Sequence, residues 1–283
     1  MRAIPPSRKR GWASFRAQSR HGMIGIGHTL GRLVPLPTHP CFTHVNPPTG
    51  QSFDHFRAAL GERGPVVLPA LLLCDFGHLA LEVERLEAAG ALGLHLDVMD
   101  GRFVPQLTYG LVVVEAVRRS AKGPIEVHLM VEDPAACIEA YSKAGADILT
   151  VHLEGLVDPR RTLQMISSFG PRAHLAISPG TPVEQVEPYL DSCDGVLVMS
   201  VEPGYGGQPF NPVALDKLAR LAALRVTMGG SFRLAVDGGI SVETVGPVAA
   251  AGAELIVAGS AVIRSSDYAS AIAQLEHIAR SAI

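Results

Sequence analysis

The chain of 283 residues contains few lysines and few cysteines. The lysines are Lys9, Lys122, Lys143 and Lys217, and none of them follows directly on a predicted strand. A Schiff-base aldolase needs a lysine amine at its reacting centre, so that class of enzyme is disfavoured. The four cysteines are far apart and form no C-x-x-C pair. Their spacing argues against a zinc ribbon or a disulfide framework and fits a reducing cytosol.

Long apolar runs are also missing, because no stretch reaches the length of about 18 residues that a membrane span needs. Charge is distributed unevenly: residues 1–53 contain seven Lys or Arg and no Asp or Glu, which leaves 17 basic and 27 acidic side chains in the remainder. A basic surface is the usual sign of nucleic-acid binding. We therefore expect no membrane partner and no nucleic-acid partner.

Residues 1–62 show no sustained helical or strand period and are rich in Pro, Gly, Arg and Ser. Three interpretations compete: an unstructured extension, a translation start assigned too far upstream, and an organelle transit peptide, since transit peptides are Arg-rich and poor in acidic residues. We favour an unstructured or misassigned extension and hence a cytoplasmic protein. A transit peptide would instead place the protein in an organelle.

Residues 63–283 alternate between short apolar runs and longer helical patterns, which predicts one catalytic domain. Strands are predicted at Val66–Leu73, Leu92–Leu96, Ile125–Leu129, Asp147–Val151, Ala173–Ile177, Gly195–Met199, Phe232–Val236 and Glu254–Val257. Helices are predicted around 78–89, 111–120, 134–143, 159–168, 183–190, 211–222, 241–250 and 267–280.

Eight strand–helix units in a domain of this size predict an α/β fold of the (β/α)8 TIM-barrel type. The alternative is a doubly wound open sheet, which usually carries a G-x-G-x-x-G turn after its first strand. The predicted first strand leads instead into Cys74-Asp75-Phe76-Gly77. In a barrel, chemistry is found at the C-terminal ends of the strands, so the residues at those ends are the candidates for function.

Four groups at predicted strand ends could hold a metal ion. His95 and Asp97 are two residues apart on a strand and point to the same face, while His128 and Asp237 follow on the third and seventh strands. Two imidazoles and two carboxylates suit one divalent ion such as Zn²⁺, Fe²⁺, Mn²⁺ or Co²⁺. Each histidine alone could equally be a hydrogen-bonded core residue, but four groups at matching positions favour metal binding.

Glycine-bearing loops predict a phosphate site. Asp237-Gly238-Gly239 and Ala258-Gly259-Ser260 follow the seventh and eighth strands, where barrels of this type bind phosphate through backbone N–H groups near helix starts. A third loop contains Gly204, Tyr205, Gly206 and Gly207, and it could close over the same phosphate. Each loop alone could be an ordinary tight turn.

Proton transfer is the chemistry that remains for such a site. Asp97 and Asp237 on opposite sides of a bound sugar could act as base and acid on opposite faces of one carbon, and a metal ion would stabilise the enediolate between them. This arrangement predicts epimerisation without a nicotinamide cofactor. Met99, Met130 and Met199 also fall near strand ends, where they could form an apolar cap that excludes water or could simply pack in the core.

Several long segments resemble the ribulose-phosphate 3-epimerase family, in the family's order and from about Val67 to the C-terminus. They are His95-Leu-Asp-Val-Met-Asp100-Gly, Phe103-Val-Pro-Gln-Leu-Thr108, Val127-His-Leu-Met130, Met199-Ser-Val-Glu-Pro-Gly-Tyr-Gly-Gly207-Gln, Val236-Asp-Gly-Gly239 and Val257-Ala-Gly-Ser260. Residues before 60 have no counterpart.

The resemblance implies a barrel of the ribulose-phosphate-binding type and the interconversion of D-ribulose 5-phosphate and D-xylulose 5-phosphate, a step of the pentose phosphate pathway. It implies one divalent metal ion held by His95, Asp97, His128 and Asp237. Asp97 would accept the proton at C3 and Asp237 would donate one, with roles exchanged in reverse. It also implies substrate contacts from His128, Asp237, the loop Gly204–Gly207, Gly238, Gly239, Gly259 and Ser260. A homo-oligomer is compatible with the sequence.

The chain departs from the family at the end of the first strand, where Pro-Ser-Ile-Leu-Ser is usual and the first serine hydrogen-bonds the sugar. Ala70 and Leu73 replace these serines. An epimerase for a related ketose phosphate, such as allulose 6-phosphate, is therefore the nearest alternative. A non-catalytic phosphosugar-binding barrel is a further alternative. Metal-assisted decarboxylases and aldol enzymes of related barrels carry Asp-x-Lys-x-x-Asp at the second strand, and this chain lacks that lysine.

Overall fold

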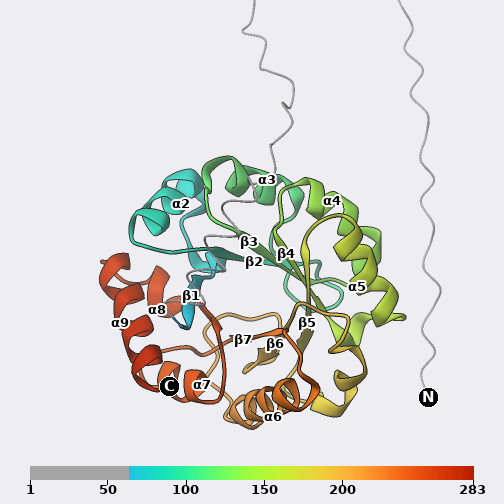
Figure 1. The fold of residues 1–283 in the computed structure, drawn as a ribbon. Helices are drawn as coiled ribbons and strands as arrows, with labels where there is room; N and C mark the ends of the chain where they lie inside the picture. The colour runs from blue at the N-terminus through green and yellow to red at the C-terminus, as the bar shows by residue number, and fades with distance from the viewer. Residues whose placement is uncertain (1–63) are drawn as a thin grey trace, which may run out of the picture. The chain divides into compact units, whose positions relative to one another are not determined.

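A computed structural model describes residues 64–283, which form an eight-stranded parallel barrel surrounded by helices (Figure 1). The predicted division at residues 62 and 63 stays a prediction, since the proposed extension lies outside the described residues. The strands span Val66–Pro69 (β1), Leu94–Met99 (β2), Ile125–Met130 (β3), Ile148–His152 (β4), Arg172–Ile177 (β5), Gly195–Met199 (β6), Arg233–Asp237 (β7) and Leu255–Ala258 (β8).

The strands pair in parallel in the order β1-β8-β7-β6-β5-β4-β3-β2. A parallel bridge between Ala70 and His95 joins the end of β1 to β2 and brings the two edges of the sheet together. A closed sheet exposes no strand edge, and it brings the C-terminal ends of all its strands to one mouth. The predicted TIM barrel is confirmed.

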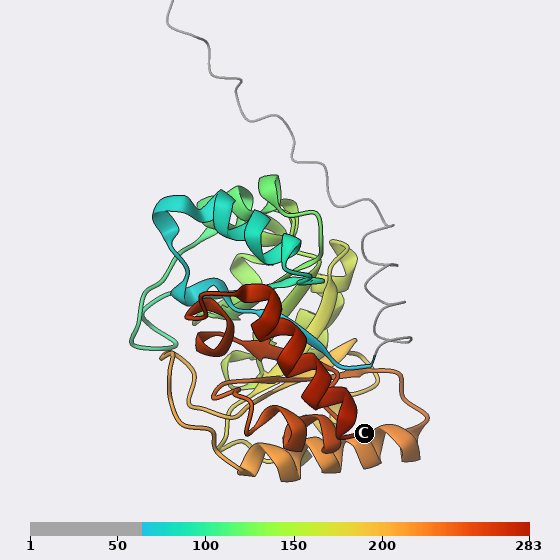
Figure 2. The same cartoon turned by 90° about the vertical axis from the view of Figure 1, so that its left-hand side faces the viewer.

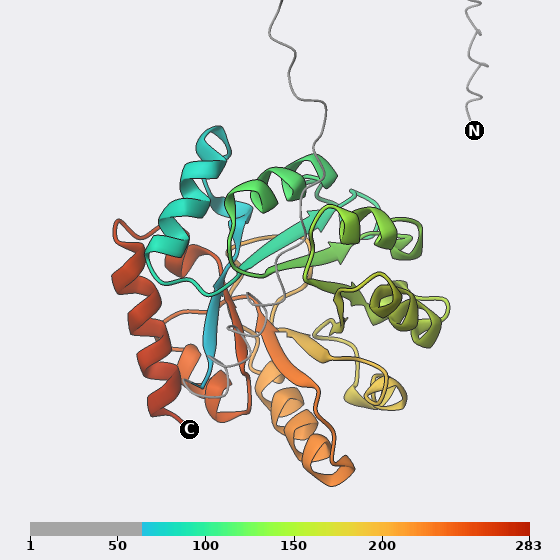
Figure 3. The ribbon, with the colours of Figure 1, turned by 45° about the horizontal axis from the view of Figure 1, so that its top comes forward.

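Helices lie outside the strands, as Figure 3 shows from a tilted direction. The α-helices span Leu79–Ala88 (α2), Leu111–Ser120 (α3), Ile138–Lys143 (α4), Pro159–Ser168 (α5), Val213–Met228 (α6), Val245–Ala250 (α7), Ser260–Ile263 (α8) and Tyr268–Ser281 (α9). In the side view of Figure 2, α9 lies beside β1. There the Glu276 carboxylate accepts a hydrogen bond from the Val67 N–H at 3.3 Å.

Beyond shifts of a few residues at the ends of several elements, two predicted elements differ from the structure. The α-helix predicted at 183–190 is wrong: two short 3-10 helices, Val183–Gln185 and Glu187–Tyr189, occupy this segment. Pro188 has no N–H and disfavours a helical conformation at the residue before it, so one continuous α-helix cannot form. The first strand ends at Pro69 rather than at Leu73, because residues Leu71–Leu73 turn into another 3-10 helix.

The barrel interior is apolar on one side and polar on the other. Small and branched side chains such as Leu68, Leu197 and Leu255 pack together on the strands from β5 round to β1. On β2 to β5 the inward positions carry buried polar groups: His95, Asp97, Glu126, His128, Thr150, His152 and His174. Such groups are costly to bury unless they are paired, so they mark the part of the barrel devoted to a function. No helix among residues 64–283 is long and apolar enough to cross a membrane.

Candidate active site

The four residues predicted to bind a metal lie together inside the barrel. His95 and Asp97 are in phase on β2, and the pairing register places Asp97 beside His128 on β3. Asp237 is the last residue of β7. One possible ligand atom from each of the four lies within 4.8 Å of the other three. Strand register and the two-residue period therefore position all four side chains.

Two carboxylate oxygens face two ring nitrogens in this cluster. Oδ1 of Asp97 is 3.2 Å from Nε2 of His95 and 3.3 Å from Nδ1 of His128. Oδ2 of Asp237 is 3.9 Å from each of the same nitrogens. This set of two imidazoles and two carboxylates fits a divalent transition metal ion better than magnesium, which prefers oxygen ligands.

The two aspartates differ in their affinity for a proton. Burial alone would raise the pKa of Asp97, but the adjacent His95 and His128 rings outweigh burial and lower that pKa below its ordinary value. Burial and the Asp97 charge raise the pKa of Asp237 to about 7. Near neutral pH the two carboxyl groups are therefore poised in different protonation states, which is what an acid–base pair needs.

A second layer of polar residues supports the histidines. Nδ1 of His95 is 3.0 Å from Oε2 of Glu126, and the Thr150 hydroxyl donates to the other oxygen of Glu126. Nε2 of His128 is 2.9 Å from Nε2 of His152, whose Nδ1 is 3.1 Å from Oε2 of Glu154. The sequence alone predicts no role for these four supporting residues. The available signal was the two-residue spacing that places Glu126 in phase with His128 and Thr150 in phase with His152.

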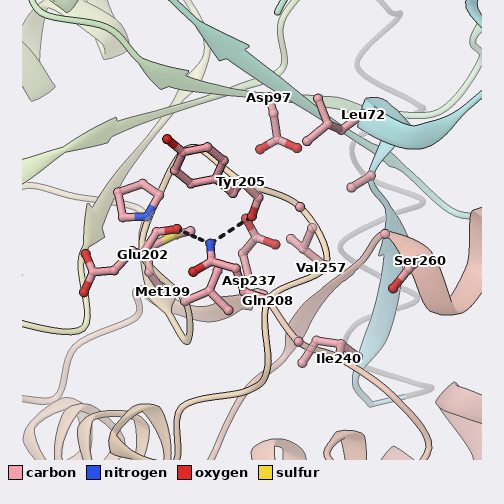
Figure 4. A pocket seen from close by; sticks show the side chains of 18 of the residues that line it. Leu72, Asp97, Met199, Glu202, Tyr205, Gln208, Asp237, Ile240, Val257 and Ser260 are labelled. Carbon is pink, nitrogen blue, oxygen red and sulfur yellow. Dashed lines mark hydrogen bonds between the residues drawn. The ribbon is translucent and has the colours of Figure 1, made fainter. Parts of the chain in front are cut away.

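A cavity of about 370 Å³ opens over the cluster. Asp97 and Asp237 both line it, from the two sides that Figure 4 shows. Met99, Met130 and Met199 line it as well, so the predicted apolar cap residues lie at the cavity. His95 and His128 are fully buried and are not among the lining residues. A substrate contact from His128 therefore stays a prediction.

The predicted phosphate residues line the other part of the cavity, and no lysine or arginine is among the described residues around it. They are Gly204, Tyr205, Gly206, Gly207, Gly238, Gly239, Gly259 and Ser260. Gly238 and Gly239 have φ values of +108° and +59°, a region that favours glycine. The Gln208 side chain donates to the backbone carbonyls of Glu202 and Tyr205 and holds the 204–207 loop in shape (Figure 4).

The end of β1 forms an apolar wall of the cavity. Ala70, Leu72 and Leu73 all line it, and a Cβ atom at Gly206 would lie 3.7 Å from Leu72 and 3.8 Å from Leu73. The glycine loop thus passes directly over this wall. Ala70 is the position at which the family resemblance predicts a hydroxyl group for the sugar.

Comparison with known proteins gives consistent matches over the barrel. The sequence model of the Ribulose-phosphate 3 epimerase family matches residues 66–263. A protein named ribulose-phosphate 3-epimerase from Bacillus subtilis is 44% identical over 210 residues, covering 74% of this chain and 97% of that protein. The protein of the same name from Synechocystis is 42% identical over 217 residues, covering 76% and 94%.

A chloroplastic ribulose-5-phosphate-3-epimerase from Arabidopsis thaliana is 42% identical over 209 residues, covering 73% of this chain and 74% of that protein. Among solved structures, KGPDC from Streptococcus mutans in complex with D-R5P aligns with a TM-score of 0.60. That alignment covers 77% of this chain and 98% of the other at 16% identity, so it supports the fold alone.

Proposed function

The chain belongs to the ribulose-phosphate 3-epimerase family, and from this premise we propose that it interconverts D-ribulose 5-phosphate and D-xylulose 5-phosphate. One observation carries the proposal: Asp97 and Asp237 line the same cavity on opposite sides and adjoin the same two histidines. Epimerisation needs an acid and a base on opposite faces of one carbon.

The proton moves between these two carboxyl groups and C3 of the sugar. Asp97 accepts the C3 proton from one face, which leaves an enediolate, and Asp237 returns a proton to the opposite face. The roles are exchanged in the reverse direction. Both groups are largely buried, and in a buried site the charges of fixed groups act more strongly than in water.

His95, Asp97, His128 and Asp237 are the residues that would hold a divalent ion, as their nitrogen and oxygen atoms fit Zn²⁺, Fe²⁺, Mn²⁺ or Co²⁺. When bound, such an ion supplies Lewis-acid stabilisation of negative charge on the sugar oxygens. His95 and Asp97 come from one strand, so the register of β2 against β3 sets their position relative to His128.

The glycine loops hold the phosphate end of the substrate. Backbone N–H groups at Gly238, Gly239 and Gly259, with the Ser260 hydroxyl, are suited to bind a dianion where no basic side chain of residues 64–283 lines the cavity. The 204–207 loop closes over the same phosphate. Met99, Met130 and Met199 exclude water beside the reacting carbon.

An assay on both candidate sugars tests the proposal. The purified protein is incubated with D-ribulose 5-phosphate or with allulose 6-phosphate, after chelation and after each divalent ion is returned. We expect a higher kcat/KM for D-ribulose 5-phosphate, loss of activity on chelation and recovery with a transition metal. A preference for allulose 6-phosphate, or binding of either sugar without turnover, would contradict the assignment.

We place the reaction in the cytoplasm, because the cysteine spacing fits a reducing compartment. A targeting role for residues 1–62 is the competing hypothesis, and one relative is named as chloroplastic. Fusion of residues 1–62 to a fluorescent protein separates the two, since diffuse fluorescence supports the cytoplasm and import into an organelle contradicts it.

A further inference from the structure

Each histidine of the cluster is backed by a carboxylate that is not one of the four proposed ligands. Glu126 lies behind His95, with 3.0 Å between its Oε2 and Nδ1 of the ring. Glu154 contacts His128 indirectly, because the ring of His152 lies between them and contacts both. The two histidines face the cluster with different nitrogens, Nε2 of His95 and Nδ1 of His128. Some feature of the protein must set this difference.

Glu126 determines the orientation of His95. An ionised carboxylate can only accept hydrogen bonds, so Nδ1 of His95 is the donor in this contact. The Thr150 hydroxyl donates to the second oxygen of Glu126, and all three side chains are buried. With its Nδ1 proton held in this way, His95 presents Nε2 to Asp97 and Asp237.

Glu154 acts on His128 through two successive hydrogen bonds. Nδ1 of His152 donates to Oε2 of Glu154 at 3.1 Å, so Nε2 of the neutral His152 ring is an acceptor. That nitrogen is 2.9 Å from Nε2 of His128, which must therefore carry the proton. With Nε2 protonated, the lone pair of Nδ1 is the one available to a bound ion; without an ion, Nδ1 lies 3.3 Å from Oδ1 of Asp97, to which it can donate only as part of a doubly protonated ring.

The second oxygen of Glu154 is also committed. Its Oε1 accepts the backbone N–H of Ser178 at 2.7 Å and the hydroxyl of Thr181, both in the loop after β5. Lys217 holds this loop by donating to the carbonyls of Ser178, Pro179 and Thr181. The loop thus holds the Glu154 carboxylate in position, and the carboxylate determines which nitrogen of His152 and of His128 carries the proton.

We propose that Glu126 and Glu154 are positioning residues, which determine the ring nitrogen that each histidine presents to the metal. This inference rests on the metal site of the proposed function. Partners of this kind in other metalloproteins fix the tautomer of the ligand, and their loss typically lowers metal affinity by about 10- to 100-fold. Glu154 is the more distant residue and allows the sharper test.

A glutamine at each position has a different predicted effect, although both changes remove one negative charge. In Glu154→Gln the single carbonyl oxygen must accept from the Ser178 N–H, so the amide NH2 faces His152. The NH2 group donates to Nδ1 of His152, which exchanges the protonated and unprotonated nitrogens of both His152 and His128. His128 would then direct an N–H at the metal. At 126 the carbonyl can stay with His95, because the Thr150 hydroxyl can accept a hydrogen bond as well as donate one.

The experiment compares the full-length protein with Glu154→Gln, Glu126→Gln and the exposed-helix control Glu84→Gln. Zn²⁺ affinity is measured by competition with a fluorescent chelator, and thermal unfolding verifies folding. Nitrogen-15 NMR of the metal-free proteins reports which nitrogen of His128 is protonated. We expect a loss of roughly 10- to 100-fold in Zn²⁺ affinity for Glu154→Gln, a smaller loss for Glu126→Gln, and no change for the control.

In the wild type we expect His128 to be protonated at Nε2, and in Glu154→Gln at Nδ1. Equal losses in the two variants would mean that only charge matters and would overturn the inference, as would an unprotonated Nε2 of His128 in the wild type. Absence of Zn²⁺ binding by the wild type would instead contradict the proposed metal site. The wild-type NMR result needs neither metal nor a variant, so it tests the inference separately from the proposed metal site.

Discussion

Replacement of Gly239 by alanine is expected to weaken phosphate binding more than it destabilises the fold. Gly239 has a φ of +59° and lines the cavity beside Gly238. A Cβ atom there would lie 2.6 Å from both Cα and the backbone N of Phe210. Because these are backbone atoms, the loop itself must move, and its N–H groups must move with it.

Two costs follow from this geometry. The left-handed backbone conformation costs an alanine roughly 1–2 kcal/mol, and this cost falls on the stability of the whole protein. Displacement of one N–H from the phosphate removes a hydrogen bond to a charged group, worth about 1.5–3 kcal/mol. The second cost falls on substrate binding and corresponds to an increase of roughly 10- to 150-fold in KM.

Gly229→Ala is the matched control. Gly229 has a φ of +61° at the end of α6, and a Cβ atom there would have nothing within 4 Å. Steady-state kinetics with D-ribulose 5-phosphate, inhibition by inorganic phosphate, and urea unfolding are measured for both variants. We expect both variants to lose the stability that the left-handed conformation costs, and Gly239→Ala to lose more because of its contact with Phe210; a raised KM and weaker phosphate inhibition are expected for Gly239→Ala alone. A wild-type KM in Gly239→Ala would refute the phosphate assignment.

Two further changes test the surroundings of the cluster. Burial lowers the pKa of His152 from 6.5 to about 4, so between these values the unfolded chain binds a proton that the folded chain does not. Stability is therefore retained above pH 6.5 and lost as the pH falls towards 4, with a cost of about 2.5 kcal/mol at pH 4.5. Urea unfolding of the metal-free proteins should therefore show that the free energy of unfolding of His152→Asn falls by about that much less than that of the wild type between pH 6.5 and pH 4.5. Parallel pH profiles of the two proteins would contradict the lowered pKa of His152. Ala70→Ser restores the expected hydroxyl and should lower KM about 2- to 12-fold, as a hydrogen bond of roughly 0.5–1.5 kcal/mol predicts; an unchanged KM would mean that the sugar does not reach this wall.

The sequence predicts the barrel and the four-residue cluster because both depend on short-range patterns. Alternation of strands and helices identifies the fold, and the ends of parallel strands must meet at one mouth. His95 and Asp97 share a face because they are two residues apart, and the order of the strands brings in His128 and Asp237. No knowledge of side-chain rotamers is needed for these predictions.

The supporting residues could not be predicted in the same way. The contact of His128 with His152 depends on how two rings on neighbouring strands are turned, and the role of Glu154 depends on a loop that starts at Ser178. The α-helix predicted at 183–190 does not form because Pro188 interrupts it, although the apolar spacing of the segment is helical. The early end of β1 at Pro69 was hidden by the apolar run that follows it.

Proton exchange at C3 tests the central proposal, the pairing of Asp97 with Asp237, most directly. The wild type, Asp97→Asn and Asp237→Asn are incubated with D-ribulose 5-phosphate in deuterated water, and deuterium at C3 is followed by NMR. A two-base mechanism predicts rapid incorporation with epimerisation in the wild type. It predicts loss of at least about 100-fold in epimerisation for each variant, the lower range for removal of one acid–base group. Full epimerase activity in either variant would contradict the account.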